Sequence, residues 1–133
     1  MSTLRVWAAA FAAAGLTMAA VGNGSAAPPA GSVANGKAIF QRTCANCHSA
    51  EIGVNKIGPS LWDVVGRPIA SVPDYNYSAR LQRLKVEWQV WDSSALDVYL
   101  RDPRAFHGVK MYFKGLPDAT DRADVIAYLS GLK

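Results

Sequence analysis

Both cysteines of this chain lie in a single run of five residues, which reads Cys-Ala-Asn-Cys-His from Cys44 to His48. Three interpretations of this run compete. A redox-active pair of thiols is expected near a βαβ pattern, and no such pattern surrounds the run. A structural zinc site needs four ligands, so both cysteines, His48 and His107 would use every cysteine and histidine in the chain at an untypical spacing. The third interpretation is covalent heme attachment, in which both sulfurs form thioethers and the adjacent imidazole binds iron.

Residues 1–26 have the pattern of a secretory signal peptide. The basic residue Arg5 precedes an uncharged stretch, Val6–Val21, and small residues follow. The alternative is an uncleaved membrane anchor, although the apolar stretch is slightly short of the about 20 residues that a membrane span needs. We expect export to the periplasm, with a membrane-anchored form only if the leader is retained. Residues 27–32 are expected to be a flexible lead-in to one small domain, residues 33–133.

Export of a chain with no other cysteines favours heme c attached through Cys44 and Cys47, with His48 as an iron ligand. Two intervening residues let both sulfurs reach neighbouring substituents on one edge of a flat macrocycle, and the next residue points its imidazole at the metal. For the opposite face of the iron, the sequence beyond the leader offers Met111, His107 or no protein ligand. Met111 falls in an expected loop, where a side chain can cross the heme face without breaking helical hydrogen bonds.

Helical spacing of apolar residues predicts an all-α domain with three main helices. The first carries Val33, Gly36, Phe40 and Thr43 on one stripe, the last carries Val125, Tyr128, Leu129 and Leu132, and a third runs from Asp92 or Ser93 to Arg101 and stops before Pro103. No segment alternates at period two, so strands are not expected. Gly36 costs the first helix about 0.5–1 kcal/mol relative to Ala, and close approach of the last helix would compensate for it.

Capping residues and breakers refine this prediction. Asp118 is expected to cap the last helix with Asp121 in its first turn, and Gly131 to end it. Shorter helical turns are expected around Ser60–Val65 and Ser78–Arg83. Long loops connect these elements, and such loops make sense in a small domain only if something fills its centre. A heme would do so.

Several short motifs follow one another along the chain outside the cysteine run. They are Gly36–Phe40, Ile57–Leu61, Gly66-Arg67, Tyr75–Ser78, Trp91, Tyr99-Leu100 with Pro103, Lys110-Met111 and Ile126–Leu129. In this order, from about Val33 to Leu132, they resemble the class I c-type cytochromes, of the short soluble branch that includes the mitochondrial and photosynthetic-bacterial proteins. The resemblance implies the cytochrome c fold, with three main helices, short turns and long loops wrapped around one covalent heme.

The resemblance also implies residues that surround the heme. Met111 would be the axial thioether opposite His48, and the Pro59 carbonyl would accept a hydrogen bond from the other ring nitrogen of that histidine. A carboxylate removed from water needs hydrogen-bond donors or a cation. Three residues align with those that surround a buried heme propionate: Arg67, Tyr77 and Trp91.

The chain departs from the family pattern ahead of the expected thioether ligand. The segment between Pro103 and Met111 is one residue shorter than the common form, and His107 takes the place of a usual proline. Val109 and Leu81 stand where a hydroxyl side chain and an asparagine are common. These changes reduce the polarity expected near the heme, and they keep a bis-histidine site with His107 as an alternative.

The function expected from these features is that of a soluble one-electron carrier, not an enzyme. It would shuttle electrons between exported or membrane-bound redox partners, such as an oxidase, reductase, dehydrogenase or photosynthetic complex. The alternative is a heme subunit dedicated to one dehydrogenase, or a ligand-binding heme sensor with a labile sixth ligand. A net charge of +4 without a Lys/Arg run gives no argument for nucleic acid, and we expect a monomer. Five lysines are candidates for a basic rim around the heme edge: Lys37, Lys56, Lys85, Lys110 and Lys114.

Overall fold

The computed structural model describes residues 30–133, so the expected signal peptide lies outside the described residues. In chain order the elements are α1 (Val33–Ile39), a π-helical turn η1 (Phe40–Cys44), α2 (Ala79–Trp88), α3 (Ser93–Arg101), a 3-10 turn η2 (Pro103–Ala105) and α4 (Ala119–Ser130). Over this range the structure contains no sheet, only an isolated antiparallel bridge between Pro68 and Val90. The expected all-α class is therefore confirmed. Between residues 30 and 133, no helix combines the length and the apolarity that crossing a membrane requires.

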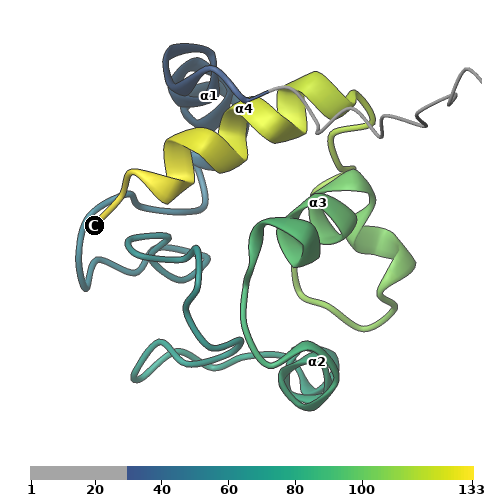
Figure 1. Ribbon diagram of the computed structural model, residues 1–133. Coiled ribbons are helices and arrows are strands. Elements are labelled where there is room, and N and C mark those ends of the chain that lie inside the picture. Colours follow the sequence, from purple (N-terminus) through teal and green to yellow (C-terminus); the bar gives the residue numbers. More distant parts are fainter. Residues whose placement is uncertain (1–29) are drawn as a thin grey trace, which may run out of the picture.

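Helices α1 and α4 cross at one end of the molecule, and the other elements surround the region beside this crossing (Figure 1). Gly36 of α1 lies so close to α4 that an added Cβ atom would overlap the backbone of Asp124. The aromatic rings of Phe40 and Tyr128 pack beside this contact, with centroids 5.4 Å apart. The close approach expected at Gly36 is confirmed, and it accounts for a glycine inside a helix.

The start of α1 differs from the expectation in two respects. Ser32, placed at the end of the expected flexible lead-in, caps α1 by accepting from Asn35 N at 3.3 Å. Its own backbone N–H donates to Asp124 Oδ1 at 2.6 Å, which fixes it to α4. Val33 is 56% exposed, so the expected apolar stripe was wrong at this residue. The residues that α1 buries begin one turn later, with Gly36 and Ile39.

Helix α3 follows the expectation closely. Asp92 caps it by accepting from Ala95 N at 2.7 Å, and the helix ends at Arg101. Pro103 is buried and begins the 3-10 turn that follows. The face that α3 buries consists of three residues: Leu96, Tyr99 and Leu100.

Helix α4 also begins and ends where the sequence indicated. The carboxylate of Asp118 accepts from Thr120 N at 2.7 Å and from Asp121 N at 3.0 Å. The helix ends at Ser130, and Gly131 is its C-cap. Both expected boundary signals are confirmed.

Helix α2 is longer than expected, because the sequence pattern indicated only a short helical turn over Ser78–Arg83. The helix spans ten residues, Ala79–Trp88, and Ser78 caps it by accepting from Leu81 N at 3.2 Å. Only Leu84 within it is fully buried, so the apolar stripe is too weak to reveal its length.

The segment Ser60–Val65 forms turns and contains no helix, contrary to the expected helical turn. Asp63 has a φ of 53°, in the left-handed region. A residue with this backbone conformation interrupts a right-handed helix. The expected turn was therefore wrong in type, although the chain does reverse direction there.

Candidate functional site

A cavity of about 240 Å³ lies in the interior, and five separate segments of the chain contribute to its wall. These segments lie within residues 43–48, 57–67, 75–81, 91–99 and 109–113. All eight expected site residues line the cavity: Cys44, Cys47, His48, Pro59, Arg67, Tyr77, Trp91 and Met111. Most of the remaining lining is apolar, which suits a flat macrocycle with a few polar groups at its margin.

The π-helical turn η1 ends at Cys44, and the turn that follows it places Cys47 and His48 at the cavity wall. Backbone N–H groups of Cys47 and His48 both donate to the Cys44 carbonyl, at 3.0 and 2.9 Å, so a tight turn presents the three side chains together. Cys44 is half-buried, Cys47 is exposed, and the two thiols are not bonded to each other. Burial raises the pKa of the Cys44 thiol, and a contact with the Thr43 hydroxyl at 3.4 Å partly offsets this.

The imidazole of His48 is fixed by backbone on two sides. Its Nδ1 lies 2.8 Å from the Pro59 carbonyl oxygen, and because a carbonyl only accepts, Nδ1 carries the proton. Burial is the main cause that lowers the pKa of this imidazole. Gly58 lies directly against the ring, where a Cβ atom would overlap it. The neutral ring therefore keeps a lone pair on Nε2, which is the form that binds a metal.

Met111 supplies the thioether of the cavity wall. It is half-buried and lies in the irregular segment between η2 and α4. His107, the other candidate for the opposite face of the iron, is exposed and is not part of the lining. The structure thus brings together His48 and Met111, and it keeps His107 outside.

Arg67 lies at the edge of the cavity and is partly buried. Its guanidinium donates to the Trp62 carbonyl at 2.6 Å and to the Ser60 carbonyl at 3.0 Å. Burial lowers the pKa of this guanidinium, which nevertheless stays charged at neutral pH. The two carbonyls orient the side chain and leave further N–H donors for a ligand in the cavity.

Tyr77 and Trp91 line the cavity together with Arg67. The Tyr77 hydroxyl accepts from Val72 N at 3.2 Å, and burial raises the pKa of the phenol. Trp91 is buried and packs edge-on against Tyr99 with ring centroids 5.0 Å apart. Within residues 30–133, neither the Tyr77 hydroxyl nor the Trp91 ring N–H donates a hydrogen bond, so both donors are available to an acceptor in the cavity.

Two residues of the site were not singled out from the sequence for the roles that they play. Gly58 makes room for the histidine ring. Tyr75 donates from its hydroxyl to the Ile57 carbonyl at 2.8 Å and joins two separate segments of the cavity wall. Both lie inside motifs that resembled the c-type cytochromes, and that position was the available signal.

Part of the cavity margin is open to solvent. Ile57 is 80% exposed and Tyr112 is fully exposed, although both contribute to the lining. Of the five lysines that were candidates for a basic rim, Lys110 lines the cavity, and Lys56 donates to the Ala45 carbonyl at 2.7 Å. Lys37, Lys85 and Lys114 are not part of the lining, and Lys114 lines a separate concavity. The margin therefore combines exposed apolar side chains with positive charge.

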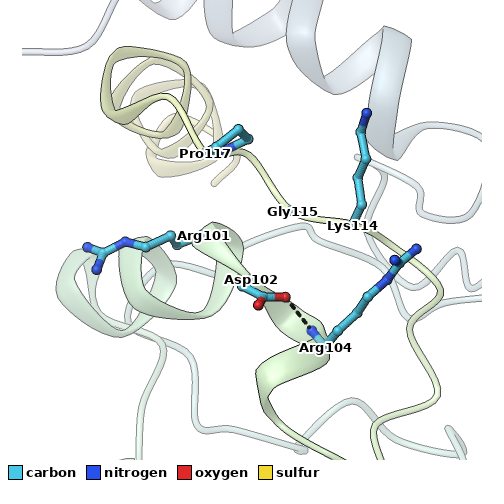
Figure 2. A pocket seen from close by; sticks show the side chains of 6 residues that line it. All are labelled: Arg101, Asp102, Arg104, Lys114, Gly115 and Pro117. Carbon is cyan, nitrogen blue, oxygen red and sulfur yellow. Dashed lines mark hydrogen bonds between the residues drawn. The ribbon is translucent and has the colours of Figure 1, made fainter.

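A second concavity lies outside this site, on the surface between the end of α3 and the segment that precedes α4 (Figure 2). It has a volume of about 470 Å³ and is open to solvent. Its lining consists of Arg101, Asp102, Arg104, Lys114, Gly115 and Pro117, and it contains none of the expected site residues. Charged side chains dominate this surface, so it does not suit an apolar macrocycle.

Comparison with known proteins places residues 33–133 within the family model described as Cytochrome c. The chain is 38% identical to "Cytochrome c" from Euglena viridis over 104 residues, which cover 77% of this chain and 99% of that protein. It is 43% identical to "Cytochrome c2" from Rhodopila globiformis over 108 residues, covering 80% and 98%. A "Cytochrome c homolog" from Rickettsia conorii is 45% identical over 97 residues, and the match spans only 53% of that longer relative.

A solved structure shares the fold. The structure of cytochrome c2 from Rhodospirillum centenum superimposes with a TM-score of 0.70 at 32% sequence identity, and the match covers 77% of this chain and 98% of that one. The agreement therefore extends over nearly the whole solved chain.

Proposed function

Since this chain belongs to the cytochrome c family of electron carriers and carries one covalent heme c, we propose that it is a one-electron carrier whose iron is bound by His48 and Met111. The observation that carries the proposal is the cavity itself, which gathers both thiols, one imidazole and one thioether from distant parts of the chain. When bound, heme supplies an iron that cycles between ferrous and ferric states, and a thioether ligand favours the ferrous state.

The two cysteines would anchor the macrocycle and His48 would bind the iron from one face. Gly58 and the Pro59 carbonyl support this role, because together they fix the orientation of the ring and the position of its proton. A hydrogen bond at Nδ1 also raises the basicity of Nε2 toward the metal. A ligand held in this way needs little rearrangement when the charge of the iron changes.

Arg67, Tyr77 and Trp91 would hold a heme propionate at the other side of the cavity. Support comes from their shared position on the lining and from their donors, one charged and two neutral. A buried carboxylate is costly unless such groups surround it. These three side chains would therefore orient the heme within the cavity as well as neutralise its charge.

Redox proteins are the partners that we propose, and they would dock over the exposed margin of the cavity. Ile57 and Tyr112 offer apolar contact there, and Lys56 and Lys110 offer positive charge. An acidic oxidase, reductase, dehydrogenase or photosynthetic complex would suit this margin. We propose that the carrier works as a monomer in the periplasm, which agrees with the signal peptide expected in residues 1–26.

The optical spectrum of the oxidised holoprotein tests this proposal. We expect a methionine-to-ferric charge-transfer band that persists at neutral pH and disappears in Met111→Ala. His107→Ala is the matched control, and its band should stay. A band that survives Met111→Ala would contradict the assigned ligand. Rapid uptake of imidazole by the unsubstituted protein would favour a ligand-binding heme protein instead.

A further inference from the structure

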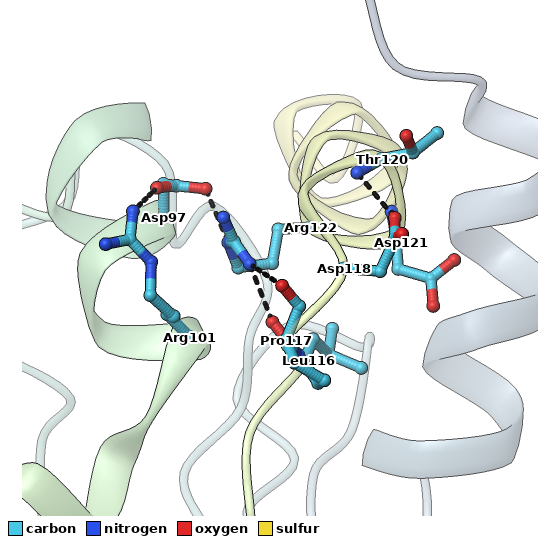
Figure 3. A network of polar contacts seen from close by, with 8 residues as sticks. All are labelled: Asp97, Arg101, Leu116, Pro117, Asp118, Thr120, Asp121 and Arg122. Atoms are coloured by element: carbon cyan, nitrogen blue, oxygen red, sulfur yellow. Dashed lines mark hydrogen bonds and ion pairs between the residues drawn. The ribbon is translucent and has the colours of Figure 1, made fainter.

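Arg122 of α4 holds the segment that contains Leu116 and Pro117 (Figure 3). This segment lies between Met111 and α4 in the chain. Its side chain is only 5% exposed. Nη1 donates to the carbonyls of Leu116 and Pro117, at 2.8 Å each, and Nε donates to Asp97 Oδ1 at 2.6 Å. One buried cation therefore joins α3, α4 and the chain between them.

The same segment also lies directly on α3. Leu116 N donates to the Leu100 carbonyl at 2.8 Å. Gly115 has a φ of 95°, and a Cβ atom added there would overlap the backbone of Arg101. The backbone of Gly115 and Leu116 therefore lies in direct contact with α3, and these contacts fix the path of the chain from Met111 to α4.

Side-chain packing, and not backbone hydrogen bonding, supports the stretch that contains Met111: Met111 and Phe113 pack against the hydrophobic core. Within the described chain, no backbone N–H of residues 110–115 donates to another backbone group, whereas Val109 and Leu116 on either side do. Before Met111, the segment is anchored by Phe106, whose ring packs against Trp88 and Tyr99 with centroids 5.2 and 5.3 Å away. The backbone path through Met111 is therefore fixed by hydrogen bonds only at its two ends, and Arg122 is the side chain that donates to the backbone at the second end.

We propose that Arg122 is a positioning residue that keeps Met111 in the cavity wall. This inference rests on the proposed binding of iron by Met111. Without the guanidinium, the carbonyls of Leu116 and Pro117 lose their donor, and they regain hydrogen bonds to water only if the segment moves off α4. Loss of Arg122 therefore costs free energy in the arrangement that keeps Met111 in the cavity wall, and it favours an arrangement in which Met111 has moved away from the site where it would bind iron.

Arg101 provides a matched control because it binds the same carboxylate. Its Nη2 donates to Asp97 Oδ2 at 3.0 Å, but its side chain is 58% exposed. The side chain points away from Lys114 and Arg104 (Figure 2) and donates to neither of the two carbonyls that Arg122 holds. Substituting Arg101 perturbs Asp97 and leaves the segment after Met111 in place.

The test is the imidazole affinity of the ferric holoprotein, measured optically in Arg122→Met, Arg122→Lys and Arg101→Gln, beside the midpoint of guanidinium unfolding. We expect Arg122→Met to raise imidazole affinity at least tenfold, which corresponds to about 1.4 kcal/mol. Arg122→Lys keeps the charge without the planar fork and should raise the affinity by about threefold. Arg101→Gln should stay within about twofold of the unsubstituted protein because its effect on a surface ion pair is small.

The inference is overturned if Arg122→Met lowers the unfolding midpoint while its imidazole affinity equals that of Arg101→Gln. Should Arg122→Met fail to fold, Arg122→Lys decides, and an unchanged affinity in that variant contradicts the proposal. The charge-transfer band of the unsubstituted protein separates this result from a failure of the assigned ligand. If that band is absent, Met111 does not bind the iron, whatever the arginine variants show.

Discussion

The crossing of α1 and α4 and the wall of the cavity are built in different ways. At the crossing, protein packs directly on protein, with Gly36 against the backbone of Asp124 and Phe40 against Tyr128. Around the cavity, mostly irregular segments and a few residues of α2 and α3 form the wall, and side chains that bind backbone carbonyls join these segments. The first region is stabilised by its own contacts, whereas the second needs the heme as its core.

The largest effect is expected when heme attachment is prevented by the double substitution Cys44→Ser and Cys47→Ser. We expect the chain to lose its cooperative thermal transition, because the apolar cavity lining is left without a partner. Amide hydrogen exchange should lose protection first in residues 45–78 and 102–118. Full protection of these segments without heme would contradict the comparison.

A smaller loss of stability is expected when a side chain is added where α1 and α4 are in closest contact. Gly36→Ala forces α1 away from rigid backbone, which should lower the free energy of unfolding by about 3 kcal/mol. Ala38→Ser, at an exposed position on the same helix, is the control and should change it by less than about 0.5 kcal/mol. Chemical unfolding of the holoproteins measures both. The heme spectrum should stay the same, and a changed spectrum in Gly36→Ala would show that the two regions are not separate.

Gly58→Ala makes the corresponding change at the cavity. An added methyl group would displace the His48 ring, so we expect a shifted reduction potential and a loss of about 2 kcal/mol in stability. Gly53→Ala is the control: its φ of 71° strains an added Cβ, but no atom lies within 4 Å of that position. A redox titration should show no shift for the control. Equal potentials in all three proteins would mean that Gly58 does not position the imidazole.

The smallest expected effect is the pH dependence of the α4 cap. Backbone N–H groups of Asp121 and Thr120 lower the pKa of Asp118 in the folded protein. The resulting stabilisation is complete above the unfolded-state pKa of about 3.9, and it disappears as the pH falls through the lower folded-state pKa. Asp118→Asn still caps the helix but does not titrate there. Its unfolding midpoint should therefore fall less between pH 6 and pH 3, and identical slopes would contradict the role of this carboxylate.

The sequence predicted those features that depend on local signals. Asp92 and Asp118 marked helix starts, and the spacing around Cys44 and His48 identified residues that the fold gathers around one cavity. The length of α2 could not be predicted, because one buried residue, Leu84, gives no periodic pattern.

The remaining features depend on contacts that reach outside a single helix or turn. Gly58 is required by a ring ten residues earlier, and Arg122 is required by carbonyls whose position follows from the path of the whole loop. Every residue type has a backbone carbonyl, so a contact to a carbonyl does not require a particular residue at that position. Apart from the family-like motif that contains Gly58, a single sequence therefore gives no signal for these contacts.

X-ray absorption at the iron edge tests the central claim most directly, because it detects the atoms bound to the metal. For the oxidised holoprotein we expect nitrogen neighbours and a single sulfur, and the sulfur should be absent in Met111→Ala and present in His107→Ala. Iron with no sulfur neighbour in the unsubstituted protein would contradict an ion held between His48 and Met111.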